Sequence, residues 1–282
     1  MVSPDQRPIA VFDSGVGGLT VLSEIHRRLP GESTVYLGDG ARTPYGPRPA
    51  TEVRRFTLEC ARWLLEQDPK VLVLACNTAT SQALPDVREQ TAVPVLGVVR
   101  PGAVAAAAAT RSRHVGVVAT AGTVASGAYP EAINEADPGV TVSQQACPDL
   151  VPLVEAGETA GAAVEAAVGG YLDALEATDP RFDTLLLGCT HYPLLRPVFE
   201  HRLGPAVRVV DSAFTTTLAL EDLLDALQSR SASRNGIPPR PHRVATTGEP
   251  AGFRAVAARI FGENLPEVES IALASAGTAL AD

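Results

Sequence analysis

Short, wholly apolar segments alternate along the chain with longer stretches in which apolar residues recur every three or four positions. The short segments predict buried strands, and the longer stretches predict amphipathic helices. The predicted strands are residues 8–12, 33–37, 71–75, 93–98, 114–119, 140–145, 184–188, 208–210 and 243–246. The predicted helices are residues 51–67, 84–90, 104–110, 157–177, 193–203, 215–230 and 252–261. Strands separated by helices indicate parallel sheets with right-handed crossovers.

The predicted strands fall into two groups. Residues 1–99 and 100–211 each contain three or four strands. We therefore predict two similar, open, mostly parallel-sheet α/β domains with the active site in the cleft between them. The tail 212–282 contains a long helix, a loop at 229–241 and a short strand–helix unit. Because this tail is too small to bury a core alone, we expect it to return to the first domain.

Composition and charge exclude several classes of protein. The 282 residues are 45% apolar and carry a net charge of −9, and basic residues form no run longer than two, so neither nucleic acid nor a membrane is an expected partner. No apolar run approaches the roughly 20 residues that span a bilayer. The N-terminus lacks the apolar region of a signal peptide, and four cysteines are too few for a disulfide framework, so a cytoplasmic location is expected.

Two cysteines occupy matching positions. Cys76 follows the apolar run 71–75, Cys189 follows the run 184–188, and small polar residues come directly after both. Open α/β sheets bind ligands at the carboxyl ends of their strands. Two equivalent thiols at such ends predict a pair of acid/base groups that face one substrate from opposite sides, each acting as a base in its thiolate form.

Polar residues beside these strand ends are further candidates. Asn77 and Thr78 follow the first cysteine and supply hydrogen-bond donors for a substrate carboxylate. Thr190 and His191 follow the second cysteine, and the imidazole can relay protons. Asp13 ends the first predicted strand, where its carboxylate can accept an ammonium group or move a proton.

Two segments rich in glycine each have two interpretations. The turn 15–18 opens a helix, so its N–H groups can bind a carboxylate, or its glycines only allow a tight turn. The spacing Gly-x-Gly-Gly does not match the dinucleotide fingerprint. The loop 38–48 mixes glycine, proline, arginine and tyrosine, and is either a functional loop or a rigid crossover.

No cofactor is expected. Pyridoxal phosphate needs a Schiff-base lysine, and the one lysine, Lys70, lies at the start of a predicted strand, on the wrong edge of the sheet. Two cysteines and one histidine without paired metal-ligand spacing are a poor zinc set, so no metal is expected either. Cys60, on the apolar face of the helix 51–67, and Cys147 are interpreted as packing residues.

Taken together, these motifs resemble the glutamate racemases of the cofactor-independent Asp/Glu racemase superfamily. The matching segments are spread over the chain, at 9–20, 36–39, 44–46, 75–79, 97–102, 116–124 and 187–194. The two cysteine motifs fit the whole superfamily, including aspartate racemases. The motifs Asp-Ser-Gly-x-Gly-Gly at 13–18 and Gly-Cys-Thr-His-Tyr-Pro at 188–193 are narrower and indicate glutamate.

The resemblance implies a two-base mechanism in which one thiolate removes the α-proton while the opposite thiol protonates the other face. It implies that Cys76 and Cys189 are the two acid/bases, with Asp13 as an auxiliary carboxylate near the first and His191 as an auxiliary imidazole near the second. Glu155 resembles a further acid of the family. The substrate-binding positions that it implies are Asp13, Ser14, Tyr45, Gly46, Asn77, Thr78, Thr120, Thr123, Thr190 and His191.

The resemblance also implies a role in supplying D-glutamate for bacterial peptidoglycan, a homodimer and, by family analogy only, an interaction with DNA gyrase. The alternatives are a racemase of aspartate or another amino acid, and a non-catalytic regulator such as a gyrase modulator. Two opposed thiols favour the enzyme, because a binding module has no need of them. Arg100 stands where many relatives carry an acidic residue, and we expect it to affect a hinge or a subunit contact.

Overall fold

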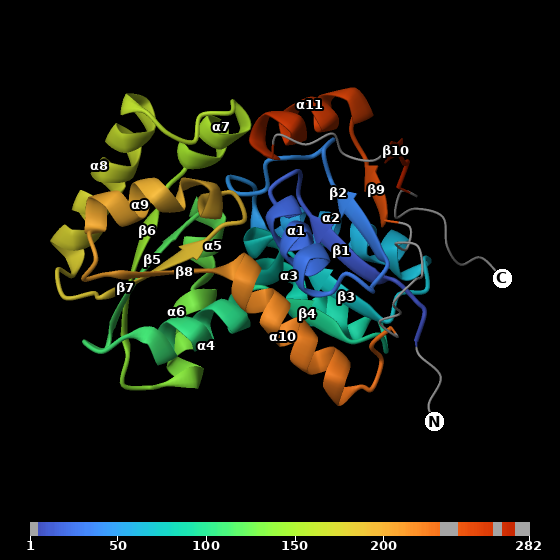
Figure 1. Cartoon of the computed structure of the whole chain (residues 1–282), viewed down its shortest axis with the longest axis horizontal. Coiled ribbons are helices and arrows are strands. Elements are labelled where there is room, and N and C mark those ends of the chain that lie inside the picture. Colours follow the sequence, from blue (N-terminus) through green and yellow to red (C-terminus); the bar gives the residue numbers. More distant parts are fainter. Residues whose placement is uncertain (1–4, 232–241, 262–266, 274–282) are drawn as a thin grey trace.

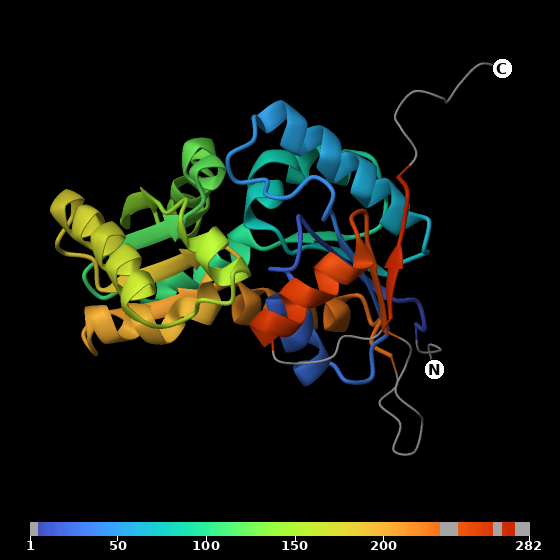
Figure 2. The same cartoon turned by 90° about the horizontal axis from the view of Figure 1, so that it is seen from above.

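Two parallel sheets, each with helices on both faces, form the two halves of the protein (Figure 1, Figure 2). The structure is a computed structural model that describes residues 5–231, 242–261 and 267–273. Its strands are β1 (Ile9–Asp13), β2 (Thr34–Gly38), β3 (Val71–Leu74), β4 (Val95–Gly97), β5 (His114–Ala119), β6 (Thr141–Ala146), β7 (Thr184–Gly188), β8 (Arg208–Asp211), β9 (His242–Thr246) and β10 (Val268–Ser270).

The helices alternate with these strands along the chain. They are α1 (Leu19–Arg28), α2 (Ala50–Leu65), α3 (Asn77–Glu89), α4 (Val99–Ala109), α5 (Ala121–Ser126), α6 (Ala128–Ala136), α7 (Leu150–Glu155), α8 (Ala162–Thr178), the 3₁₀ helix η1 (Tyr192–Leu195), α9 (Arg196–Leu203), α10 (Ser212–Ala226) and α11 (Pro250–Phe261). In the described ranges, no helix has both the length and the apolar character needed to cross a membrane.

The two sheets share the order of four of their strands. The first runs β10-β9-β2-β1-β3-β4 and the second β6-β5-β7-β8, with every pair of the described strands parallel. The core order of the first sheet, β2-β1-β3-β4, is therefore repeated in the second. In both halves the strand that precedes a candidate cysteine, β3 or β7, lies beside the first strand of its half. The predicted fold class is confirmed.

Alternate residues of the central strands bury their side chains on opposite faces of each sheet. In β3, Val71 and Val73 join one apolar cluster, which includes α1 and α10, and Leu72 and Leu74 join another, which includes α2 and α3. The second sheet has the same arrangement, with one cluster toward α8 and α9 and one toward α4 and α6. Strands buried on both faces explain why their sequences are apolar without interruption.

The C-terminal segment adds two strands to the first sheet. β9 pairs with β2, and β10 pairs with β9. The division into domains, with boundaries near residues 99 and 212 and the tail assigned to the first domain, remains a prediction. α10 begins at Ser212 and packs against both α1 and α4, so it connects the two halves. Residues 232–241 of the predicted loop 229–241 lie outside the described residues.

Several elements differ from the sequence-based expectation. α3 begins at Asn77 instead of residue 84, because the Cys76 side chain caps its first turn. α8 begins at Ala162 instead of residue 157, since Gly157 and Gly161 have positive φ angles of 88° and 98° that a helix does not accommodate. The short elements α5, α6, α7 and β10 were not predicted at all, because three to nine residues carry little periodic signal.

Candidate active site

A cavity of about 180 Å³ lies where the carboxyl ends of the two sheets face each other. Segments that follow β1, β2, β3, β5, β6 and β7 contribute to its wall. The lining residues are Ser14, Thr43, Pro44, Tyr45, Gly46, Pro47, Cys76, Asn77, Thr78, Thr120, Ala121, Cys147, Pro148, Val151, Pro152, Cys189, Thr190 and His191. Both candidate cysteines therefore line the same cavity, one from each half.

Cys76 comes two residues after the last residue of β3 and caps helix α3. Its Sγ accepts a hydrogen bond from the Ala79 amide at 3.4 Å and lies 3.5 Å from the Ser14 hydroxyl. Burial raises the pKa of Cys76 to about 12, and the neighbouring Asp13 carboxylate adds to the rise. At neutral pH this group is consequently a thiol, in the form that gives up a proton.

Cys189 directly follows β7 and has a histidine beside it. The Nδ1 atom of His191 lies 3.8 Å from the Cys189 Sγ, and its Nε2 atom lies 3.1 Å from a Glu155 carboxylate oxygen. Burial lowers the pKa of His191, but the hydrogen bonds to Cys189 and Glu155 outweigh that effect and raise it to about 10. The imidazole therefore carries a positive charge at neutral pH, and this charge lies directly beside the Cys189 side chain.

Asp13 lies behind the cavity wall and is fully buried. Burial raises the pKa of its carboxyl group above the ordinary value. The Gly15 amide donates to Oδ2 at 2.9 Å, and the Thr190 hydroxyl approaches Oδ1 at 3.5 Å from the other half. The group that binds the glycine-rich turn is thus the protein's own Asp13 side chain, and Gly17 and Gly18 do not line the cavity.

The wall between the two thiols is rich in hydrogen-bonding groups. Asn77 donates from Nδ2 to the Tyr129 hydroxyl at 2.7 Å, and its buried Oδ1 atom has no hydrogen-bond partner among the described residues. The Thr78 hydroxyl lies 2.8 Å from that of Thr120 and 3.2 Å from that of Thr123. An unpaired acceptor beside a cluster of hydroxyl groups can receive the ammonium and carboxylate groups of an amino acid.

The loop after β2 supplies another part of the wall. The ring of Tyr45 is buried against Phe12 and Phe56, and its hydroxyl donates to Asp39 at 2.5 Å. Because the hydroxyl is already engaged, the backbone of Tyr45 and Gly46 is what this loop can offer to a ligand. The Gly46 carbonyl accepts a hydrogen bond from the Gly122 amide of the other half at 2.9 Å.

Most of the residues predicted as site residues come together at this cavity. Those that line it are Ser14, Tyr45, Gly46, Cys76, Asn77, Thr78, Thr120, Cys189, Thr190 and His191. Asp13, Thr123 and Glu155 do not line it, but each contacts a residue that does. Glu155 instead borders a neighbouring cavity of about 250 Å³.

Sequence analysis missed part of the site. Cys147 lines the cavity although it is fully buried, as the packing interpretation requires. It directly follows β6, at the same sheet edge as Cys189, and that position was a signal that could have identified it. Pro148, Val151 and Pro152 extend this wall into α7. Cys60 is fully buried in an apolar cluster, as predicted.

Lys70 lies away from the cavity, at the opposite edge of the first sheet. Its ammonium group is buried and contacts Glu32 at 2.5 Å and the Ser229 carbonyl at 2.7 Å. A lysine held in this way is not available for a Schiff base. Within the described part of the chain, histidine, cysteine, aspartate and glutamate side chains form no group of three or more that could hold a metal ion.

The fold and the paired thiols define the class: an α/β protein of the two-domain amino-acid racemase type. The chain belongs to the Asp/Glu/Hydantoin racemase family, which matches residues 10–220. It is 48% identical to a glutamate racemase of Shouchella clausii over 267 residues, which are 95% of each chain.

Two solved structures are similar over nearly their whole length. A glutamate racemase isoform from Bacillus anthracis has a TM-score of 0.88 and 40% identity, with 95% of this chain and 98% of that chain covered. A glutamate racemase from Francisella tularensis in complex with D-glutamate has a TM-score of 0.88 and 32% identity, with 96% and 99% covered.

Proposed function

We propose that this protein is an amino-acid racemase that interconverts L-glutamate and D-glutamate by a two-base mechanism at the α-carbon. The observation that carries the proposal is the pair Cys76 and Cys189, which come from equivalent strand ends and line one cavity from its two halves. The substrate assignment is supported by the curated relative at 48% identity and by the relative that was solved with D-glutamate.

The two thiols have different surroundings. Positively charged His191 lies beside Cys189, whereas burial keeps Cys76 protonated, with a pKa of about 12. In one direction, the Cys189 thiolate removes the α-proton and the Cys76 thiol protonates the opposite face of the planar intermediate. This turnover leaves the proton on Cys189 and a thiolate at Cys76, which is the form in which the other direction begins. The enzyme must therefore return a proton to Cys76 before it repeats a turnover of the same sense.

The remaining site residues bind the substrate or orient the groups that bind it. Asn77 Oδ1 accepts a hydrogen bond from the substrate ammonium group, and the hydroxyls of Thr78, Thr120 and Thr190 donate to a carboxylate. Ser14 and the backbone of Tyr45 and Gly46 complete the binding wall. Asp13 and Glu155 act from behind this wall, on Thr190 and His191 respectively, while Thr123 holds the hydroxyl of Thr78.

We also propose that the enzyme works in the cytoplasm, where its product supplies D-glutamate for bacterial peptidoglycan, and that it needs neither metal nor cofactor. Four free thiols support a reducing compartment. Dialysis against a chelator and treatment with a carbonyl reagent should leave the rate unchanged. A large loss of activity in either treatment would contradict cofactor independence.

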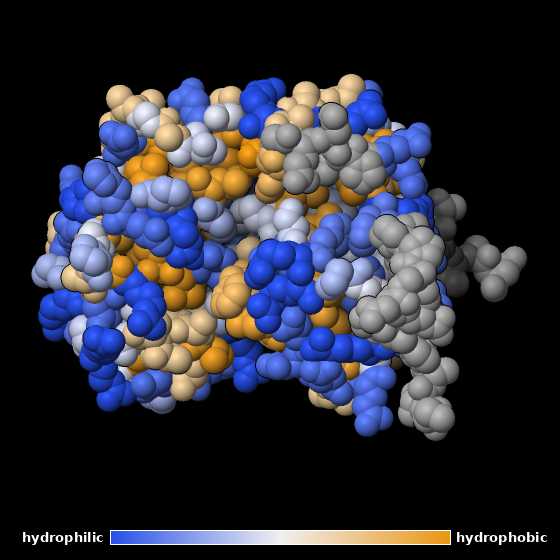
Figure 3. Space-filling view, viewed as in Figure 1, coloured by the Kyte–Doolittle hydropathy of each residue, from blue (hydrophilic) through white to orange (hydrophobic). Residues whose placement is uncertain are grey.

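A homodimer is the expected assembly. Among the described residues, the large apolar side chains that are exposed are Val104, Phe214 and Leu227, on or next to the neighbouring helices α4 and α10. Figure 3 shows apolar residues between hydrophilic ones on one face of the molecule. Analytical ultracentrifugation of the wild type and of Phe214→Glu tests the proposal, which predicts a dimer that the substitution weakens. A monomeric wild type would contradict it.

The direct test of the reaction and the substrate is exchange in D₂O. We expect deuterium to enter the α-position of both L- and D-glutamate, together with inversion, and at a much lower rate for either enantiomer of aspartate. Preference for aspartate would replace the substrate assignment, and no exchange with any amino acid would favour a non-catalytic protein such as a gyrase modulator. The paired thiols make that last alternative the less favoured one.

A further inference from the structure

The loop 39–47 forms one wall of the cavity without belonging to a helix or a strand. Five of its residues, from Thr43 to Pro47, line the cavity, and the Gly46 carbonyl reaches the other half through the Gly122 amide. A wall built from irregular backbone needs fixed points if it is to hold a substrate in one geometry. The structure provides such a point at Asp39.

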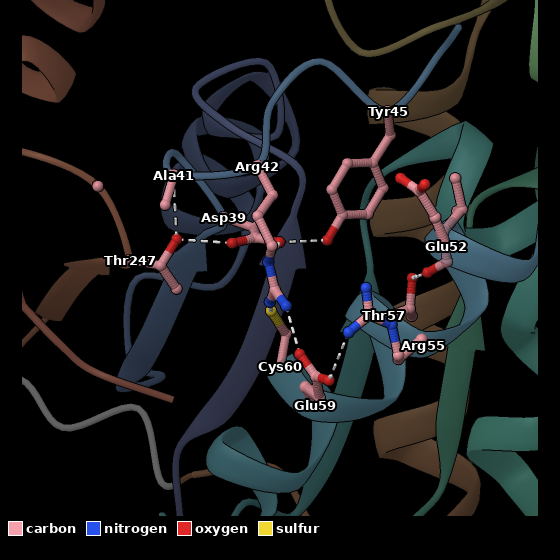
Figure 4. Close-up of polar contacts among 12 residues, drawn as sticks. Asp39, Ala41, Arg42, Tyr45, Glu52, Arg55, Thr57, Glu59, Cys60 and Thr247 are labelled. Carbon is pink, nitrogen blue, oxygen red and sulfur yellow. Dashed lines mark hydrogen bonds and ion pairs between the residues drawn. The ribbon is translucent and has the colours of Figure 1, made fainter. Parts of the chain in front are cut away.

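Asp39 directly follows β2 and is fully buried. Three donors converge on its carboxylate: the Tyr45 hydroxyl at 2.5 Å, Arg42 Nε at 2.7 Å and the Thr247 hydroxyl at 2.6 Å (Figure 4). A buried carboxylate is stable only when its oxygens are paired in this way. Asp39 is the first residue of the loop, and two of the donors, Arg42 and Tyr45, belong to the same loop. These hydrogen bonds therefore fix the conformation of the loop.

Arg42 extends this arrangement to helix α2. Its guanidinium group pairs with Glu59 and lies 3.4 Å from the Cys60 Sγ (Figure 4). It also lies 4.2 Å from the centre of the Phe56 ring. The loop is therefore attached to α2 as well as to β2. None of these contacts touches the cavity, which separates them from the substrate-binding groups.

The third donor comes from the C-terminal part of the chain. Thr247 lies in the turn between β9 and α11, and its hydroxyl both donates to Asp39 and accepts a hydrogen bond from the Ala41 amide at 3.1 Å. The Thr247 amide donates to the Gly38 carbonyl at 3.2 Å. The same unit reaches the other half, where Arg259 of α11 donates to the Glu155 carbonyl at 3.3 Å.

We propose that Asp39 and Thr247 are positioning residues, which hold the Tyr45–Gly46 wall in the geometry that binds the substrate. The turn between β9 and α11 thereby fixes the active-site loop 39–47 through Thr247, in addition to connecting elements of the first half. This inference rests on the proposed substrate site. Asp39 and Thr247 touch no reacting atom, so they act on binding and leave the chemistry of the thiols unchanged.

The test uses Thr247→Val, which keeps the shape of the side chain and removes the hydroxyl, and Thr247→Ser, which keeps the hydroxyl. Loss of the hydrogen bonds should raise KM for both glutamate enantiomers by about three- to tenfold. We expect kcat to stay within about twofold of wild type in Thr247→Val, and Thr247→Ser to restore KM.

The matched control is Thr57→Val. Thr57 is fully buried, whereas Thr247 is partly buried, and among the described residues the Thr57 hydroxyl binds the Val53 carbonyl of its own helix, at 2.8 Å. Both Thr→Val variants should lower thermal stability, whereas Thr247→Val alone should raise KM. An equal KM in Thr247→Val and wild type, or an equal KM increase in the two variants, would overturn the proposal.

Hydrogen–deuterium exchange of the backbone gives a readout that does not depend on the reaction. Thr247→Val should accelerate exchange in peptides that cover the loop 39–47, and Thr57→Val should not. Unchanged exchange would refute the positioning role of Thr247 even if the enzyme is active. If the wild type does not racemise glutamate but Thr247→Val still accelerates loop exchange, the proposed function is refuted. The positioning of the loop by Thr247 is then still supported.

Discussion

The side-chain amide of Asn77 donates a 2.7 Å hydrogen bond to the hydroxyl of Tyr129, and this bond joins α3 of one half to α6 of the other. The ring of Tyr129 also packs against β7, since a Cβ on Gly188 would approach its Cε2 atom to 2.7 Å. The residue next to Cys76 is therefore oriented by a residue that lies against the strand leading to Cys189. Binding and the relative position of the two thiols depend on each other through this pair.

Tyr129→Phe should weaken substrate binding. The substitution leaves the buried Nδ2 atom of Asn77 without its acceptor, which costs about 1–3 kcal/mol of stability, and frees the amide to rotate. We expect KM for both enantiomers to rise by roughly tenfold, measured by steady-state kinetics. Tyr171→Phe, in which the lost hydroxyl binds Asp149 near the surface, is the control and should leave KM unchanged. The same KM in both variants would mean that Tyr129 does not orient Asn77.

Gly17→Ala should impair catalysis. A Cβ at this position would lie 2.4 Å from the Thr190 hydroxyl and 2.5 Å from the His191 ring, so one of these groups must move. His191 places a positive charge beside Cys189, so a displaced ring should lower kcat by at least about tenfold. The control is Gly169→Ala in α8, where a Cβ meets nothing within 4 Å and alanine favours the helix. Full activity in Gly17→Ala would show that the close approach has no functional consequence.

Glu155→Gln should move the alkaline limb of the pH–rate profile to lower pH. The pKa of His191 is about 10 in the folded protein, above the 6.5 of an exposed histidine, and the Glu155 carboxylate contributes to that rise. The charged ring thus stabilises the fold fully below pH 6.5, and this contribution is lost as pH rises through about 10. Removing the carboxylate lowers the folded pKa, so kcat/KM and alkaline stability should both decline at lower pH. An unshifted alkaline limb would exclude Glu155 as a partner that tunes His191.

His26→Gln should make the protein less sensitive to acid. Burial, and to a smaller extent the charge of His242, lowers the pKa of His26 to about 4. The unfolded chain binds this proton near pH 6.5 and the folded chain only near pH 4, so stability falls as pH drops between those values. Melting temperatures at pH 7 and 4.5 should therefore differ less in His26→Gln than in wild type. His201 is exposed, so His201→Gln is the control. If the melting temperatures at pH 7 and 4.5 differ by as much in His26→Gln as in wild type and the control, the prediction is contradicted.

The parts of the site that could be predicted from sequence are those that follow directly from strand patterns. The uninterrupted apolar runs before Cys76 and Cys189 fix both the strands and the sheet edge, so the thiols and the polar residues after them could be found. The same rule applied to β6 would have found Cys147, but its strand is less apolar and its end was predicted one residue early, at residue 145 instead of Ala146.

Contacts between distant segments could not be predicted. Tyr129 meets Asn77, and Thr247 meets Asp39, across intervals that no helical or strand period connects. Gly17 was interpreted through the turn that it permits, whereas the structure shows that the side chains of Thr190 and His191 leave no room for a Cβ. Which residues share a wall depends on how the two halves meet, and single-sequence patterns do not carry that information.

The central claim is that Cys76 and Cys189 each serve one face of the substrate, and single-thiol variants in D₂O test it most directly. Cys76→Ala and Cys189→Ala should each lose racemisation by at least ~10²–10⁴-fold while remaining folded. Each variant keeps one base, so it should still exchange the α-proton of one enantiomer without inversion, and the two variants should select opposite enantiomers. Near-normal racemisation in either variant, or the same enantiomer exchanged by both, would contradict the two-base account.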